Sequence, residues 1–141
     1  MKTKTFLLLC LLLPFSASLV SAQALPKGAV IGFHTLTITL NPDATMNQAM
    51  DFFINKYIPA SEKNFPGTKI YLLSGDRGEN KFKIALMEVF ESVQVRDKYY
   101  PAPDKPTPEA EAASNKLQES LGDMSKIFLD YSSVYTDWIV K

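Results

Sequence analysis

Residues 34–42 read His-Thr-Leu-Thr-Ile-Thr-Leu-Asn-Pro, and this stretch decides the fold class. Successive side chains of a β-strand point to opposite faces, so His34 and Leu36 share a face that the intervening threonines do not. We therefore predict a half-buried strand that begins near Ala29. Residues 41–43 end it, because proline cannot continue a strand ladder and Asn and Asp favour turns.

The segment after this strand has the pattern of an amphipathic helix. Thr45 and Gln48 form a capping-box pattern at its start. Pro59 is expected to kink or end the helix, and the turn residues 65–67 follow it. Apolar residues recur at three- and four-residue spacing and make one face: Met46, Ala49, Met50, Phe53 and Tyr57.

Two further strands are predicted over residues 68–74 and 81–90. The glycine-flanked polar connection between them, residues 75–80, favours an antiparallel hairpin. A phosphate-binding loop at this place would need the lysine spacing of the Walker motif, which the sequence lacks, and it would need to open a helix. In the second strand, one face is predicted to carry the following residues: Phe82, Ile84, Leu86, Glu88 and Phe90.

The remaining chain predicts two helices and a last strand. Ser92 can cap a short helix over residues 93–100, and the prolines of residues 101–108 favour a solvent loop or a lid. Thr107 and Pro108 open a long helix, whose apolar stripe is predicted to run to Tyr131, with Gly122 weakening its middle by about 1 kcal/mol. Residues 134–140 have the pattern of a fourth strand.

This order of elements, β-α-β-β-α-β, predicts an α+β, ferredoxin-like fold. Such a fold has a four-stranded antiparallel sheet with its helices on one face. The other face would leave a larger apolar patch than soluble monomers tolerate. A second copy of the chain is the simplest cover for it, so we expect a homodimer.

The first residues have the pattern of a secretory signal peptide, which we place at residues 1–22. A basic start precedes a short apolar run and a small-residue segment with cleavage before Gln23, or alternatively before Leu25. The apolar run is shorter than the roughly 20 residues that span a bilayer, so we expect no membrane association once the leader is removed. Residues 23–141 are then predicted to form one α+β domain.

Composition narrows the location and the partners. Cys10 lies in the leader, and export without disulfides fits a periplasmic or extracellular protein of a bacterium. Removing Lys2 and Lys4 leaves 13 basic and 15 acidic residues. The basic residues are interspersed with acidic ones, which excludes the clustered basic face of a nucleic-acid-binding protein.

Three segments together resemble the dimeric α+β-barrel superfamily. They are residues 33–42 leading into the first helix, residues 64–67, and residues 90–100. The superfamily includes antibiotic-biosynthesis-type monooxygenases, stress-responsive barrel proteins and NIPSNAP-like proteins. The resemblance implies that two sheets close into a barrel and that ligands bind in the barrel or between a sheet and its helices. Activities in the superfamily vary widely, so the resemblance does not assign one.

His34 and Glu88 are the candidate catalytic residues. His34 is the sole histidine and is the side chain expected to titrate near neutral pH; similar proteins often carry a histidine near this place. It would act as a general base or orient a ligand, or it is a hydrogen-bonded strand histidine at the edge of the core. Glu88 interrupts an apolar strand, so it lies at an edge, is paired, or has a raised pKa in a pocket.

Four aromatic residues, Tyr71, Tyr99, Tyr100 and Trp138, are candidate ligand contacts. They would line a pocket for a flat ligand, or they are ordinary core residues. No cofactor is predicted, because no helix carries a histidine of the kind that haem-handling relatives use. No cluster has metal-ligand spacing, so no metal is predicted.

Three functions remain open from the sequence. The first is an exported, homodimeric protein that binds a small molecule without catalysis. The second is a cofactor-free monooxygenase- or isomerase-like enzyme that uses His34 with Glu88 or Tyr99. The third is a structural dimerisation module.

Overall fold

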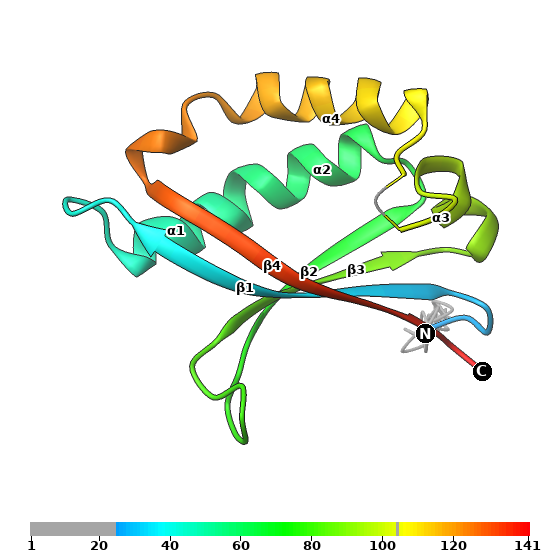
Figure 1. The fold of residues 1–141 in the computed structure, drawn as a ribbon, viewed down its shortest axis with the longest axis horizontal. Helices are drawn as coiled ribbons and strands as arrows, with labels where there is room; N and C mark the ends of the chain where they lie inside the picture. The colour runs from blue at the N-terminus through cyan, green and yellow to red at the C-terminus, as the bar shows by residue number, and fades with distance from the viewer. Residues whose placement is uncertain (1–24, 104) are drawn as a thin grey trace, which may run out of the picture.

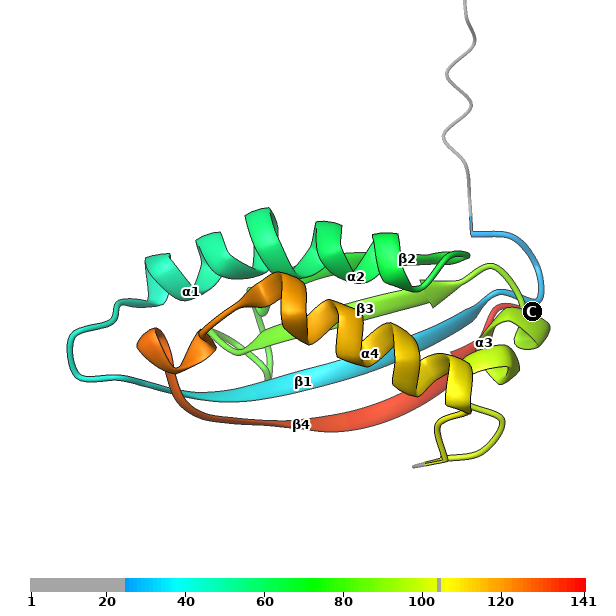
Figure 2. The same ribbon diagram turned by 90° about the horizontal axis from the view of Figure 1, so that it is seen from above.

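The computed structural model describes residues 25–103 and 105–141. The predicted signal peptide, residues 1–22, lies outside the described residues. Four antiparallel strands form one sheet in the order β2-β3-β1-β4, and the helices cover one of its faces (Figures 1 and 2). This is the predicted α+β, ferredoxin-like fold. The strands are β1 (Val30–Leu40), β2 (Thr68–Ser74), β3 (Ile84–Phe90) and β4 (Phe128–Ile139).

One continuous helical stretch follows β1. It comprises α1 (Met46–Phe52), the π-helical segment η1 (Phe53–Tyr57) and α2 (Ile58–Asn64). The predicted capping box is present at its start: Thr45 N–H donates to Gln48 Oε1 at 2.7 Å, and Gln48 N–H donates to Thr45 Oγ1 at 3.3 Å. Pro59 does not end the helix. The wide π-helical turn lies directly before it, where a residue without an N–H interrupts the ladder.

The predicted hairpin is confirmed, but its second strand starts later than predicted. β3 begins at Ile84, because Phe82 adopts a left-handed φ of 67° that a strand cannot contain. Phe82 therefore does not share the face of Glu88, as the sequence pattern suggested. The connection is tight at Gly75, where a Cβ would lie 1.7 Å from the Asn80 carbonyl oxygen.

The C-terminal part corrects the predicted long helix. After α3 (Val93–Tyr99), the helix α4 spans Pro108–Leu121 and stops there, since Gly122 has a φ of 66°. A short 3₁₀ helix, η2 (Met124–Lys126), leads into β4, which begins at Phe128 rather than at Val134. Phe128 and Tyr131 thus belong to β4 and not to the helix.

The strand register separates the sheet into two faces. The helix face packs against α1, η1, α2 and α4 and holds the core; its largest fully buried side chains are Tyr99, Phe90 and Val30. The open face is not covered by any of the described residues, which confirms the predicted one-sided arrangement. The register places the following apolar residues on the open face: Ile31, Phe33, Tyr71, Leu73, Met87, Val134 and Trp138.

Candidate functional site

A row of three residues crosses β3, β1 and β4 on the helix face, near the start of β1. Gly32 of β1 lies opposite Glu88 of β3 on one side and opposite Asp137 of β4 on the other. Residues directly opposite each other in antiparallel strands point to the same face. Two carboxyl groups therefore flank a glycine in the layer between the sheet and the helices.

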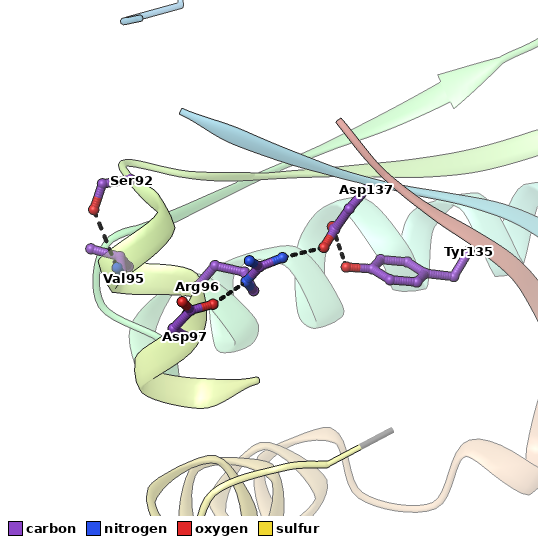
Figure 3. A network of polar contacts seen from close by, with 6 residues as sticks. All are labelled: Ser92, Val95, Arg96, Asp97, Tyr135 and Asp137. Carbon is purple, nitrogen blue, oxygen red and sulfur yellow. Dashed lines mark hydrogen bonds and ion pairs between the residues drawn. The ribbon is translucent and has the colours of Figure 1, made fainter. Parts of the chain in front are cut away.

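Asp137 belongs to a set of polar contacts that joins α3 to β4, which we call the Asp137 network (Figure 3). The Arg96 guanidinium of α3 binds both Asp137 and Asp97, with 2.5 Å between Arg96 Nε and Asp97 Oδ1. The Tyr135 hydroxyl donates to the other oxygen of Asp137. Ser92 caps α3 by accepting from Val95 N–H at 3.2 Å, as the sequence predicted. The cap fixes where α3 starts, and the helix directs Arg96 toward β4.

Gly32 makes room for the Tyr135 ring. A Cβ at position 32 would lie 3.1 Å from Tyr135 Cε2 and 3.6 Å from its hydroxyl oxygen. The ring also packs against His34, with centroids 4.6 Å apart and the planes tilted by 40°. Burial and the hydrogen bond to Asp137 raise the pKa of Tyr135. Tyr135 thus links the candidate histidine to the Asp137 network.

Glu88 has a different environment from Asp137. No hydrogen bond or ion pair to its carboxyl group is found within residues 25–103 and 105–141. Burial, together with the charge of Asp137, raises the pKa of Glu88 to about 7. Burial and the nearby Glu88 also raise the pKa of Tyr57 to about 12, and they raise the pKa of Tyr100. Glu88 therefore lies close to two tyrosines that come from the helical layer.

His34 lies beside this row and closer to solvent. It is half-buried, and burial lowers its pKa while Asp137 acts in the opposite direction. Its Nδ1 atom is 3.5 Å from Ser133 Oγ. Past the buried Phe128, the helix-facing residues of β4 are exposed, and Tyr135 keeps 44% of its surface. Water thus reaches the site from the β4 edge, and Glu88 on β3 is less exposed than these β4 side chains.

The structure separates the four predicted aromatic contacts. Tyr100 follows α3, lies near Glu88 and stacks on Phe65 at 6.5 Å. Tyr99 is buried in the core, where its hydroxyl donates to the Pro66 carbonyl oxygen at 3.1 Å. Tyr71 and Trp138 lie on the open face. A single pocket lined by all four is therefore wrong, because strand parity places two of them on the opposite side of the sheet from Glu88.

Among the hollows in the described part of the chain, two lie away from the candidate residues, and neither is lined by His34 or Glu88. One of about 210 Å³ lies at the end of α4. The other, of about 180 Å³, lies on the open face beside the β2–β3 connection. Within residues 25–103 and 105–141 no group of His, Cys, Asp and Glu side chains is arranged to hold a metal ion. No helix of the described chain has the length and apolar character needed to cross a membrane.

Several members of the site were not predicted from the sequence: Gly32, Tyr57, Arg96, Tyr135 and Asp137. One signal was available. Tyr135 and Asp137 share parity within the predicted last strand, and an acidic residue there is as unusual as Glu88 in its own strand. Which strand lies beside which, and in what register, is the information that joins these positions to Gly32.

No protein-family model matches this chain, and no curated protein matches it either. Similar solved structures include a dimeric protein of unknown function with a ferredoxin-like fold from Bacteroides fragilis NCTC 9343, which is 17% identical, with a TM-score of 0.38 over 80% of this chain and 97% of that chain. Another is an uncharacterized NIPSNAP-like domain protein from Burkholderia xenovorans, 10% identical, with a TM-score of 0.46 over 78% and 84% of the two chains. At these identities the likeness concerns the fold alone.

Proposed function

We propose that this protein is an exported homodimer that binds a small molecule on the helix face of its sheet, between Glu88 and His34. Export is supported by the leader pattern of residues 1–22, and a periplasmic or extracellular location by the absence of cysteine after Cys10. The homodimer is supported by the exposed apolar side chains of the open face. One observation carries the binding site: the half-buried Glu88 carboxyl group, on the helix face of the sheet, has no polar partner among the described residues.

A half-buried carboxyl group with no protein partner is only partly hydrated, and a polar group taken out of water costs free energy unless a hydrogen bond replaces that water. A pKa of about 7 means that Glu88 is part protonated and part ionised at neutral pH. It can then donate a hydrogen bond to a ligand or accept one from it. A ligand that supplies the missing partner would gain a bond in a region of low dielectric, where such bonds are strong.

The charges around the site select among ligands. Arg96 is the cation of the network, and it binds two carboxylates, Asp97 and Asp137. The cluster therefore carries a net negative charge even when Glu88 is protonated. An anionic ligand would meet repulsion, whereas a neutral or cationic one would not. The rings of Tyr135 and His34 at the exposed β4 edge offer stacking or cation–π contacts to such a ligand.

A cofactor-free enzyme is the second candidate, because the pKa values of Glu88 and His34 are shifted toward each other. Burial raises the pKa of Glu88 and lowers that of His34. Groups with a pKa near the working pH make the best general acids and bases. Leu86 lies opposite His34, so Glu88 is a diagonal neighbour, typically about 7–8 Å away between backbones. A small substrate between them could exchange protons with both.

A thermal-shift screen tests the binding site. Residues 23–141 would be heated with small neutral, cationic and anionic compounds, both as wild type and as Glu88→Gln. A bound compound at 100 times its dissociation constant adds about 2.7 kcal/mol to the unfolding free energy. We expect neutral or cationic compounds to give shifts that Glu88→Gln weakens and that Glu111→Gln, on the exposed surface of α4, leaves unchanged. A shift that survives Glu88→Gln would place the ligand elsewhere.

The enzymatic candidate has a separate test. Any compound that binds would be incubated with the protein and followed for conversion, with His34→Ala measured in parallel. If the enzyme uses His34 as a base, His34→Ala lowers the rate by roughly 10²–10⁴. Conversion at the wild-type rate would remove His34 from the mechanism, and binding without conversion would favour the binding protein.

A further inference from the structure

The connection between β2 and β3, residues 75–83, is not part of the proposed binding site. We call it the hairpin loop. Figure 1 shows that it projects from the sheet on the side away from the helices. Its direction places it at the border of the open face, where a second copy of the chain would lie in the proposed homodimer.

Phe82 is the most exposed large apolar side chain of the described residues, with 83% of its surface accessible. Its φ of 67° is unfavourable for a bulky residue. Hydrogen bonds hold it in this conformation, since its N–H donates to the Gly75 carbonyl at 2.8 Å and the neighbouring Lys83 N–H donates to Asn80 at 3.0 Å. A strained and exposed aromatic side chain on a hydrogen-bonded loop is a reason to look for a partner surface.

A matching hollow lies at the base of the same loop. Its apolar lining comes from Phe33, Leu73 and Ala85 of the sheet. Its other lining residues are Thr35 and Ser74 of the strands and Gly75, Asn80 and Lys83 of the hairpin loop. The hollow measures about 180 Å³. Pockets for small molecules are typically about 300–1,000 Å³. This hollow therefore fits one side chain better than it fits a drug-sized ligand.

We infer that the occupant of this hollow is Phe82 of a second copy of the chain, and that the exchange is reciprocal. The inference rests on the proposed homodimer. In a two-fold symmetric interface, each copy must present the projecting side chain and the hollow on the same surface. The hairpin loop supplies Phe82 and borders the hollow, so it meets this condition. The loop is also continuous with the apolar open face that the dimer would bury.

Charges on the loop permit two copies to approach. Asp76 and Glu79 are negative, and Arg77, Lys81 and Lys83 are positive. Within one copy, Arg77 pairs with Asp76 at 3.3 Å, and the Lys81 ammonium lies 4.8 Å from the centre of the Phe82 ring. Interspersed charges of both signs let the two loops meet without like-charge repulsion.

Sedimentation of residues 23–141 tests the inference through Phe82→Asn. Asparagine tolerates a left-handed φ far better than phenylalanine does, so this variant keeps or improves the stability of one copy while it removes the ring. We expect the dimer dissociation constant to rise at least tenfold. Ile54→Asn is the matched control, because Ile54 is also exposed but belongs to the helical layer. It should leave the dimer unchanged.

Cysteine cross-linking tests the contact directly, since residues 23–141 contain no cysteine. Phe82→Cys protein mixed with Leu73→Cys protein should form a mixed disulfide under mild oxidation, while Ile54→Cys mixed with Leu73→Cys should not. A wild-type dimer that Phe82→Asn leaves intact, or that gives no mixed disulfide, overturns this inference but not the proposed homodimer. A wild-type chain that is monomeric at all concentrations overturns both.

Discussion

Glu88 and Asp137 lie on either side of Gly32 in one row of the sheet, yet only Asp137 is paired with a cation. Arg96 reaches Asp137 from α3, whereas no cation pairs with Glu88 among the described residues, and Glu88 instead raises the pKa of Tyr57 and Tyr100. The charge of Asp137 adds to burial in raising the pKa of Glu88. Two carboxyl groups on one face of the sheet thus differ in their partners, and the one without a cation has a raised pKa.

Replacing Glu88 by glutamine should stabilise the protein at alkaline pH. The folded pKa of Glu88 is raised from 4.5 to about 7, so ionisation costs the folded chain stability as the pH rises through this range. One pKa unit corresponds to about 1.4 kcal/mol, which gives a cost of roughly 3 kcal/mol above pH 7. Glu88→Gln lacks this loss. Its unfolding free energy relative to the wild type should increase between pH 4.5 and pH 8.

Urea denaturation across this pH range measures the difference. His34 has a lowered pKa, so its protonation removes stability as the pH falls below 6.5. That contribution is present in both proteins and cancels in their difference. Glu111→Gln, on exposed helix surface, should track the wild type. A difference between Glu88→Gln and wild type that does not change with pH would contradict the assigned environment of Glu88.

Removing the Arg96 guanidinium should destabilise the fold, because the Asp137 carboxylate then loses its cation and keeps only the hydrogen bond from the Tyr135 hydroxyl. We expect Arg96→Met to lower the unfolding free energy by about 1–2 kcal/mol, since both partners are partly shielded from water. Arg77→Met is the matched control: its ion pair with Asp76 is almost fully exposed and should contribute little. Adding Asp137→Asn to Arg96→Met should recover part of the loss, as the unpaired charge is then gone. Equal effects of the two arginine variants would argue against a structural role for the network.

Gly32 should tolerate alanine only when Tyr135 is small. In the wild type the new methyl group would lie 3.1 Å from the Tyr135 ring, so the ring must move and strain its bond to Asp137. Overpacking of this kind costs about 1–3 kcal/mol. In a Tyr135→Ala background the crowding is absent, and replacing a strand glycine should then be neutral or stabilising. A double-mutant cycle of unfolding free energies measures the coupling, and additive effects would contradict the proposed crowding.

Local patterns were sufficient to predict much of this fold and part of the site. The alternation that begins at His34 placed it on the face of Leu36, which in the structure is the helix face, and Thr45, with Gln48, capped the first helix as predicted. The long final helix failed because three-residue spacing continued past Gly122, whose backbone conformation ends the helix. A helical period cannot by itself show where a helix stops.

The Asp137 network lay beyond sequence reasoning for a different reason. It depends on the register between β1 and β4 and on where α3 docks, and both are set by residues far apart in the chain. The same applies to Trp138, whose neighbours could be assigned only once the strand parity of β4 was known. Long-range register is what the sequence pattern of one strand does not contain.

The open face should be the dimer interface, and one substitution on it should separate the two copies. Trp138 keeps 61% of its surface in the single chain. In a monomer, Trp138→Asp would place the charge in water and change little, whereas in a dimer it would bury an unpaired carboxylate, which is strongly unfavourable. We expect the variant to be a folded monomer at concentrations where the wild type is a dimer.

Light scattering combined with size exclusion measures this outcome, and circular dichroism confirms that the variant is folded. Ile54→Asp supplies the comparison, because Ile54 has 52% of its surface exposed but lies on the helical layer. If Ile54→Asp separates the copies while Trp138→Asp does not, the helices rather than the sheet form the interface. The apolar side chains of the open face would then need another cover, and the reciprocal insertion of Phe82 would lose the interface on which it depends.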